Sequence, residues 1–323
     1  MIIDENLLEN LYCNGCDIRK DEPLKNHTNF RIGGPTPYMF FPRTKKSFVY
    51  TLRTIRKNGI DYRVIGGGAN ILVKDEALDF VVISTKYLSN LSLRNEDITK
   101  YLLMENSELI NIGFKDEDVY AETGVNLSRV ANWCSEDGLS GLEFASGIPG
   151  TVGGAVFMNA GAYEGEMKDI VKSVEVYDVY NDSVEILSNE ALNFSYRHSI
   201  LQEKELIVLS VIFKLEKKDI NEIFNKIEEL SQKRWSKQPL DLPSAGSIFK
   251  RPRQDFYVGT TIDKLGLKGF SLGDAMISKK HAGFIVNKGN ATFKEVLGVI
   301  NEVKKIVKEK YDIELTVEPE IWD

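Results

Sequence analysis

The chain has 323 residues, of which 42% are hydrophobic and 28% are charged, a composition typical of folded proteins. Its 41 basic and 48 acidic residues give a net charge of −7, which argues against a broad nucleic-acid-binding surface. Three cysteines make no disulfide framework, no apolar run reaches the length of a membrane helix, and the acidic start does not resemble a signal peptide. We therefore expect a soluble cytoplasmic protein of about two domains, with no nucleic-acid partner and no membrane insertion.

The first two thirds of the chain predict short strands and helices separated by glycine-rich turns. Apolar runs predict strands at 38–41, 62–65 and 80–83, and a helix at 44–58 that Gly59 ends. Residues 89–118 are weakly patterned and could form a hairpin with a loop, or an insertion. Next we expect a strand at 119–122, a helix at 126–136, an antiparallel hairpin at 174–186 and a strand at 206–215.

The pattern changes near residue 216, where helical periodicity replaces short strands. Apolar residues recur at helical spacing from Ile220 to Leu230 and predict a helix. A strand at 282–286 follows, and Thr292 with Glu295 forms a capping box for a long helix. Alternating apolar residues at 313–317 predict a final strand, so the whole chain indicates an α+β fold with a boundary near 216.

Two glycine-rich segments would let the backbone approach a ligand closely. One runs from a strand through Gly66, Gly67 and Gly68, and the other extends from Ser146 to Tyr163. Glycines permit positive φ angles, and successive amides can form an anion-binding nest. Either segment alone could be a tight turn, but together they suggest an extended dinucleotide cofactor bound by main-chain amides.

Three further segments carry polar side chains: two are suited to an anionic substrate, and the last carries a carboxylate that could be catalytic. They are Tyr196-Arg197 before a strand, the surroundings of Gly246-Ser247, and 318–320 at the C-terminus. Each could equally be a solvated turn or an acidic tail. Ser247 lacks the G-x-S-x-G elbow and is more plausibly a proton donor than a nucleophile. No set of residues has metal-ligand spacing, so we expect no metal site.

Taken in order, these motifs resemble the UDP-N-acetylenolpyruvoylglucosamine reductase (MurB) family. The matching segments are 26–34, 66–72, 147–163, 196–199, 244–252 and 280–292. The resemblance implies an FAD-binding domain of the vanillyl-alcohol-oxidase (PCMH) type at 1–215, with lobes at about 1–84 and 85–215. It further implies a smaller α+β substrate-binding domain at 216–310 and a C-terminal strand and tail at 311–323. The short interval from Arg197 to Ser247 resembles the compact type II branch.

The resemblance also implies a reaction and the residues that serve it. The family uses NADPH, through non-covalent FAD, to reduce the enolpyruvyl ether of a UDP-sugar in peptidoglycan precursor synthesis. Arg197 and Glu320 would stabilise the developing negative charge, and Ser247 would deliver a proton. Substrate would be bound by Tyr196, Lys237, Lys250 and Arg251. FAD would be bound by Gly66, Gly67, Gly68, Ala69, Asn70, Ile71, Gly147, Ile148, Pro149, Gly150, Val152, Gly153, Gly154, Asn159 and Gly161.

Three positions depart from the family pattern, namely Thr260, Met276 and Trp322, and we expect all three on the substrate side. They leave two alternatives open. One is another FAD-dependent oxidoreductase of the same superfamily, and the other is a diverged flavin-binding paralogue without catalytic turnover. The protein is expected to be a monomer or a weak oligomer.

Overall fold

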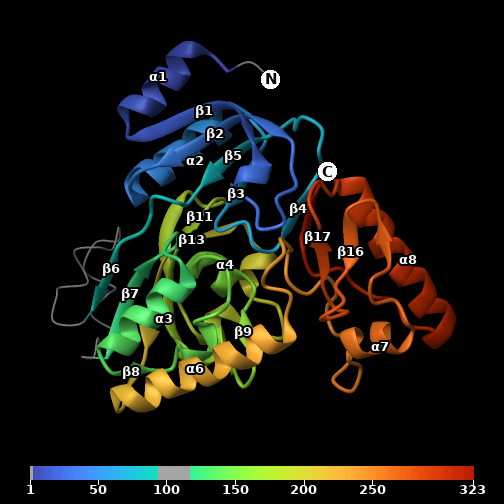
Figure 1. Cartoon of the computed structure of the whole chain (residues 1–323). Coiled ribbons are helices and arrows are strands. Elements are labelled where there is room, and N and C mark those ends of the chain that lie inside the picture. The colour runs from blue at the N-terminus through green and yellow to red at the C-terminus, as the bar shows by residue number, and fades with distance from the viewer. Residues whose placement is uncertain (1–2, 94–116) are drawn as a thin grey trace.

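The computed structural model describes residues 3–93 and 117–323 and contains three packed units (Figure 1). An N-terminal unit lies above a central unit in this view, and a C-terminal unit lies beside both. Most of the weakly patterned segment 89–118 falls outside the described residues. Within the described part of the chain, no helix is both long enough and apolar enough to cross a bilayer.

The N-terminal unit is a four-stranded sheet in the order β1-β2-β5-β3. The β1–β2 pair is antiparallel, whereas β2 and β3 each pair with β5 in parallel. Helix α2 begins at Thr44, whose side chain accepts a hydrogen bond from the Ser47 amide, and it buries Phe48, Leu52 and Ile55. The elements predicted at 38–41, 44–58, 62–65 and 80–83 are confirmed. Their bounds, with the neighbouring elements, are α1 Glu5–Cys13, β1 Cys16–Pro23, β2 Pro35–Pro42, α2 Lys45–Lys57, β3 Tyr62–Ile65, β4 Ile71–Val73 and β5 Val81–Ser84.

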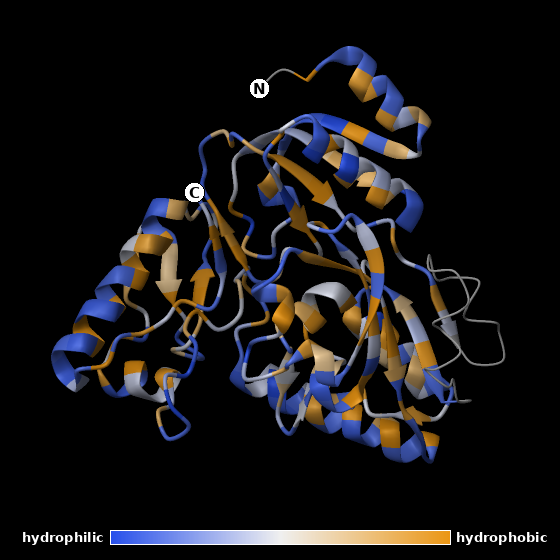
Figure 2. Ribbon diagram, turned by 180° about the vertical axis from the view of Figure 1, so that it is seen from behind, coloured by the Kyte–Doolittle hydropathy of each residue, from blue (hydrophilic) through white to orange (hydrophobic). Residues whose placement is uncertain are grey.

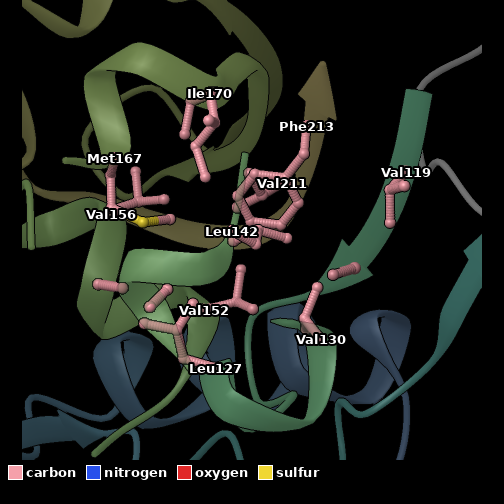
Figure 3. Packing of buried hydrophobic residues seen from close by; sticks show 14 of the residues in the cluster. Val119, Leu127, Val130, Leu142, Val152, Val156, Met167, Ile170, Val211 and Phe213 are labelled. Atoms are coloured by element: carbon pink, nitrogen blue, oxygen red, sulfur yellow. The ribbon is translucent and has the colours of Figure 1, made fainter. Parts of the chain in front are cut away.

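The central unit is an antiparallel sheet in the order β12-β11-β13-β7-β6, with helices packed against it. Its core joins sheet residues such as Val211 and Phe213 to Val130 of α3 and Val152 of α4 (Figure 3). The predicted hairpin is confirmed as β11 and β12, and the helix predicted at 126–136 is α3, capped by the Asn126 side chain. The bounds are β6 Leu91–Leu93, β7 Asp118–Glu122, α3 Leu127–Glu136, β8 Leu139–Ser140, η4 Glu143–Ala145, α4 Val152–Phe157, β9 Gly161–Ala162, β10 Gly165–Glu166, α5 Met167–Ile170, β11 Val171–Asp178, β12 Ser183–Ser188 and β13 Leu206–Lys214.

Helix α6, Ile220–Lys237, packs on the central unit, against α3 and η4. Its buried face carries Ile223 and Leu230, and the short strand β14, Glu216–Lys217, pairs with β8 just before the helix begins. The predicted substrate-binding domain, 216–310, includes α6. The change near residue 216 therefore marks a change of element type and not a change of packing unit, while the domain limits themselves stay a prediction.

The C-terminal unit packs a small sheet, β15-β16-β17, against α7 and α8. The capping box of Thr292 and Glu295 is confirmed, and α8 buries Val296, Val299 and Ile300 against the sheet side. Figure 2 shows how hydropathy is distributed over the fold: hydrophobic residues lie along the strands, and hydrophilic residues lie on the outer turns of the long helices. The bounds are α7 Val258–Lys264, β15 Ser271–Leu272, β16 Ala275–Ile277, β17 Ile285–Asn287 and α8 Phe293–Tyr311.

The C-terminal segment differs from the prediction. Residues 313–317 form no regular strand: Leu315 packs into the core of the C-terminal unit, but Val317 alone pairs with another segment, in an isolated bridge with Phe249. The strand comes later, as β18 Glu320–Trp322, and pairs in parallel with β4 of the N-terminal unit. Trp322 lies in the core of that unit, edge-on to Phe80 at 5.8 Å between ring centroids, so its expected place on the substrate side is wrong.

Candidate functional site

The two glycine-rich segments lie directly against each other. A Cβ added at Gly67 would come within 2.8 Å of Gly150 Cα, and one added at Gly66 would come within 2.5 Å of Thr151 Oγ1. Gly68 has a φ angle of +61° and is close to the carbonyl oxygen of His27. Only residues without a side chain permit this approach. The structure thus brings together two segments that lie some 80 positions apart in the chain.

The surface of this glycine cradle, formed by 66–70 and 147–154, is open at Gly147, Pro149 and Gly154, which are exposed. A Cβ added at Gly154 would meet only Thr151 Oγ1, at an ordinary 3.7 Å. That hydroxyl is buried, and it has no hydrogen-bond partner among the residues described. An open glycine surface beside an unpaired buried donor fits the phosphate groups of a dinucleotide.

Not every residue predicted to bind the cofactor faces this surface. Gly153 is buried, and a Cβ there would meet Thr123 Oγ1 at 1.9 Å, so packing within the protein explains this glycine. Ile71 and Val152 lie in hydrophobic cores, and Ile148 packs against one. The buried Asn159 side chain donates to Glu166 and to the carbonyl of Ser195. Packing or hydrogen bonds within the protein thus account for these five residues, and their contact with a cofactor stays a prediction.

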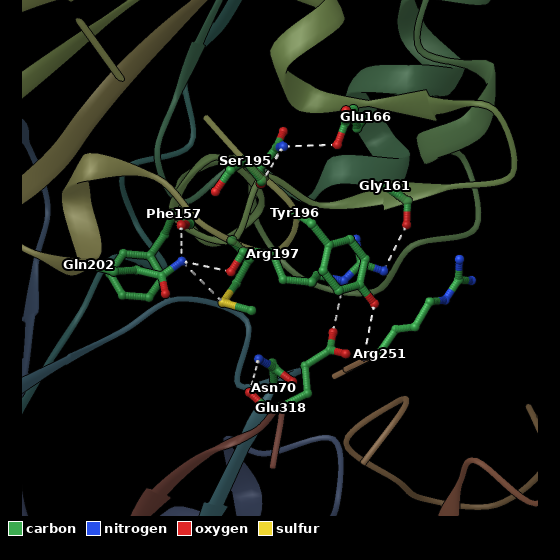
Figure 4. A network of polar contacts seen from close by, with 12 residues as sticks. Asn70, Phe157, Gly161, Glu166, Ser195, Tyr196, Arg197, Gln202, Arg251 and Glu318 are labelled. Carbon is green, nitrogen blue, oxygen red and sulfur yellow. Dashed lines mark hydrogen bonds and ion pairs between the residues drawn. The ribbon is translucent and has the colours of Figure 1, made fainter. Parts of the chain in front are cut away.

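Arg197 reaches from the central unit to the C-terminal segment (Figure 4). It sits at φ +55° in a turn closed by two hydrogen bonds between the main chains of Ser195 and His198. Its Nε donates to Glu318 Oε1 at 3.0 Å, and its Nη2 donates to the carbonyl of Gly161 at 3.1 Å. The guanidinium is thereby fixed between the two units.

Ser247 lies in an extended segment held on both sides. It forms a bridge with Phe284, and the neighbouring Ile248 donates its amide to Gly283 and accepts from the Glu318 amide at 2.8 Å. Gly246 precedes it with a φ angle of +74°, which sets the direction of the turn. Ser247 and Arg197 are therefore both close to Glu318, from segments 50 positions apart in the chain.

The C-terminal carboxylates occupy different environments. Glu318 is largely buried, and burial raises the pKa of its carboxyl group while Arg197 opposes that rise. Glu320 is exposed; its amide donates to the Asn70 carbonyl, and its side chain accepts from Trp322 Nε1 at 2.9 Å. The structure thus places Glu318, and not Glu320, against Arg197. Both are glutamates of one short segment, two positions apart, so no sequence signal distinguished them.

Cations and an aromatic residue surround this centre. The hydroxyl of Tyr196 accepts from the amide of Arg251 at 3.4 Å, and the Arg251 guanidinium stacks on Tyr257. Lys250 is partly buried and close enough to Glu318 to lower the pKa of its carboxyl group. Lys237 is exposed in the last turn of α6. The structure therefore joins Tyr196, Lys250 and Arg251 to the Arg197 neighbourhood.

Arg234 is a cation that the sequence-based site did not include. Its Cδ would lie 2.9 Å from a Cβ added at Gly147, and its buried Nε has no hydrogen-bond partner in the described part of the chain. Burial lowers the pKa of its guanidinium. The sequence contains a signal for this residue. Arg234 has no acidic residue three or four positions away with which to form an ion pair along the helix, whereas Lys233 pairs with Glu229.

No cluster of three or more His, Cys, Asp or Glu residues that could hold a metal ion occurs in 3–93 and 117–323. The buried Cys16 and Cys134 are poor nucleophiles, because burial raises the pKa of their thiols to about 11 and about 12.

The fold and the cradle define a flavoprotein class. The model of the FAD binding domain family matches residues 36–186, which contain both glycine segments, so the chain has a PCMH-type FAD-binding domain. The model of the C-terminal domain of UDP-N-acetylenolpyruvoylglucosamine reductase matches residues 238–322. This chain belongs to the UDP-N-acetylenolpyruvoylglucosamine reductase (MurB) family.

Similar proteins cover the whole chain. The UDP-N-acetylenolpyruvoylglucosamine reductase of Petrotoga mobilis is 54% identical over 99% of this chain and 100% of its own length. That of Fervidobacterium nodosum is 44% identical over 99% and 96%. The crystal structure of the MurB enzyme from Thermus caldophilus superimposes with a TM-score of 0.73 at 33% identity, covering 95% of this chain and 99% of that one.

Proposed function

We propose that this protein reduces the enolpyruvyl ether of UDP-N-acetylglucosamine enolpyruvate to the lactyl ether of UDP-N-acetylmuramate, a step of peptidoglycan precursor synthesis. NADPH is the reductant and FAD the bound cofactor. One observation carries the proposal: Arg197 from the FAD-binding domain meets Glu318 beside Ser247 of the C-terminal unit. A cation and a hydroxyl thus lie close together beside Glu318. The side chain of the cradle residue Asn70 donates to the Glu318 carbonyl, so this centre adjoins the cradle.

The cradle residues would hold the cofactor. The open surface at Gly147, Pro149 and Gly154 would bind its diphosphate. Arg234 would offset negative charge with a guanidinium whose Nε has no partner among the described residues. Neither glycine segment contains a His or Cys, so binding is non-covalent. When bound, FAD supplies hydride transfer between the nicotinamide and the substrate.

The residues of the chain supply charge stabilisation and a proton. Arg197 would bind the substrate carboxylate, where negative charge increases in the transition state. Ser247 would donate the proton to the neighbouring carbon, which is effective for a weak acid only in a site with little water and nearby cations. Tyr196, Lys237, Lys250 and Arg251 would bind the UDP-sugar. Glu320 stays a candidate for charge stabilisation, although its side chain accepts from Trp322 in the structure.

A two-part measurement tests this function. The purified protein should be yellow and release free FAD on denaturation. It should oxidise NADPH rapidly only when the enolpyruvyl substrate is present. NADPH oxidation unaffected by this substrate but stimulated by another small acid would favour a different oxidoreductase of the superfamily. Flavin that is bound but never turned over would indicate a non-catalytic paralogue.

A further inference from the structure

The guanidinium of Arg197 is oriented by contacts on two of its three nitrogens. Nε donates to Glu318 and Nη2 donates to the Gly161 carbonyl, whereas Nη1 donates to no group of the described chain. The main chain is fixed as well, since Gln202 Nε2 donates to the Arg197 carbonyl at 3.2 Å. A non-glycine residue at positive φ is strained, so the surrounding contacts must maintain this conformation.

Glu318 is held independently of Arg197. Its amide donates to Ile248 at 2.8 Å, and its carbonyl accepts from Asn70 Nδ2 at 3.2 Å. Its side chain is only 12% exposed and that of Arg197 only 23%. A buried ion pair is weak evidence for stability, because the cost of removing two charges from water is comparable to their attraction. Orientation of Arg197 is a better explanation of the pair.

We propose that Glu318 is a positioning residue: it fixes the Nε edge of Arg197 and leaves Nη1 free to bind the carboxylate of the enolpyruvyl substrate. This inference rests on the proposed function. Glu318 also bears the same charge as that carboxylate, so it weakens the attraction of Arg197 for the substrate while it orients the guanidinium. Its removal should therefore reduce the rate of the chemical step more than substrate affinity.

The test uses the FAD-loaded enzyme and follows flavin absorbance by stopped flow. Glu318→Ala should slow the saturating rate of flavin reoxidation by the enolpyruvyl substrate about ten- to hundredfold, the scale of a misplaced binding group. Its dissociation constant for the substrate should be unchanged or lower, and flavin reduction by NADPH should be normal. Glu318→Gln keeps an oxygen that accepts from Nε and should recover most of the rate. Glu314→Ala, at an exposed carboxylate of the same segment, is the matched control and should behave as wild type.

A double-mutant cycle with Arg197→Ala decides whether Glu318 acts through Arg197. If it does, Glu318→Ala causes no further slowing once Arg197 is removed. The inference is overturned if Glu318→Ala slows the reaction by the same factor with and without Arg197. It is also overturned if Glu318→Ala slows both half-reactions equally, or if it raises the substrate dissociation constant at an unchanged rate. Wild-type flavin that the enolpyruvyl substrate does not reoxidise overturns the proposed function instead.

Discussion

The glycine cradle and the centre around Arg197 are built in different ways. The cradle consists of main chain from two segments, and its shape depends on the lack of side chains at Gly66, Gly67 and Gly150. The centre consists of side chains from three segments, which tertiary contacts bring together. A main-chain site leaves a local pattern in the sequence, whereas a side-chain site depends on neighbours that no local pattern records.

The largest expected effect concerns the side-chain centre. Ser247→Ala should slow flavin reoxidation by the enolpyruvyl substrate by about 10²-fold or more, the scale of general acid catalysis, and leave flavin reduction by NADPH nearly normal. Ser247→Cys should keep more activity than the alanine variant, because a thiol still donates a proton. Stopped-flow absorbance separates the half-reactions. If both are slowed equally, or neither is, Ser247 is a structural turn residue.

Two neighbouring glycines test the main-chain site. Gly154 is exposed with room for a side chain, so Gly154→Leu should fold normally but lower FAD affinity at least about tenfold, a loss of ~1.4 kcal/mol. Gly153→Ala is the contrast, since its Cβ would clash with Thr123 and should lower the melting temperature. Flavin content and thermal melts distinguish the two. Full flavin retention by Gly154→Leu would place the cofactor elsewhere.

Arg234 tests whether the cradle also needs a side chain. Arg234→Met removes a partly buried guanidinium whose Nε is unpaired in the described chain, and should weaken FAD binding about tenfold by loss of a charge-assisted contact. Lys233→Met is the matched control, because Lys233 is exposed and pairs with Glu229. The FAD dissociation constant is the measurement. Equal constants in the two variants would show that Arg234 binds no part of the cofactor.

The same contrast explains what could be predicted from the sequence. Hydrophobic periodicity and caps located most elements, including the hairpin of β11 and β12 and the capping box of α8, because these signals are local. The partner of Arg197 could not be predicted, since residues 318 and 320 are identical side chains two positions apart and tertiary contacts select between them. The unit on which α6 packs could not be predicted for a similar reason: its apolar stripe shows that the helix is covered, but not by which unit.

The smallest expected effect concerns Lys250, which could act on the substrate or on Glu318. If it binds the anionic UDP-sugar, Lys250→Ala should raise the Michaelis constant about five- to tenfold, a loss of ~1 to 1.4 kcal/mol, with unchanged flavin content. Lys268→Ala removes an exposed lysine paired with Asp263 in the same unit and serves as the control.

The pH profile of Lys250→Ala separates the two roles. Lys250 lowers the pKa of the Glu318 carboxyl group, which burial has already raised, so removing the lysine raises that pKa further. Glu318 then becomes protonated, and loses its charge, at a higher pH than in the wild type. In that form it still accepts from Arg197 Nε but no longer opposes binding of the substrate carboxylate, so the Michaelis constant falls on acidification. An effect of Lys250 through Glu318 therefore shifts this fall to higher pH. A raised Michaelis constant with an unshifted pH dependence assigns Lys250 to the substrate, whereas an unchanged constant with an unshifted pH dependence would make it a solvated surface residue.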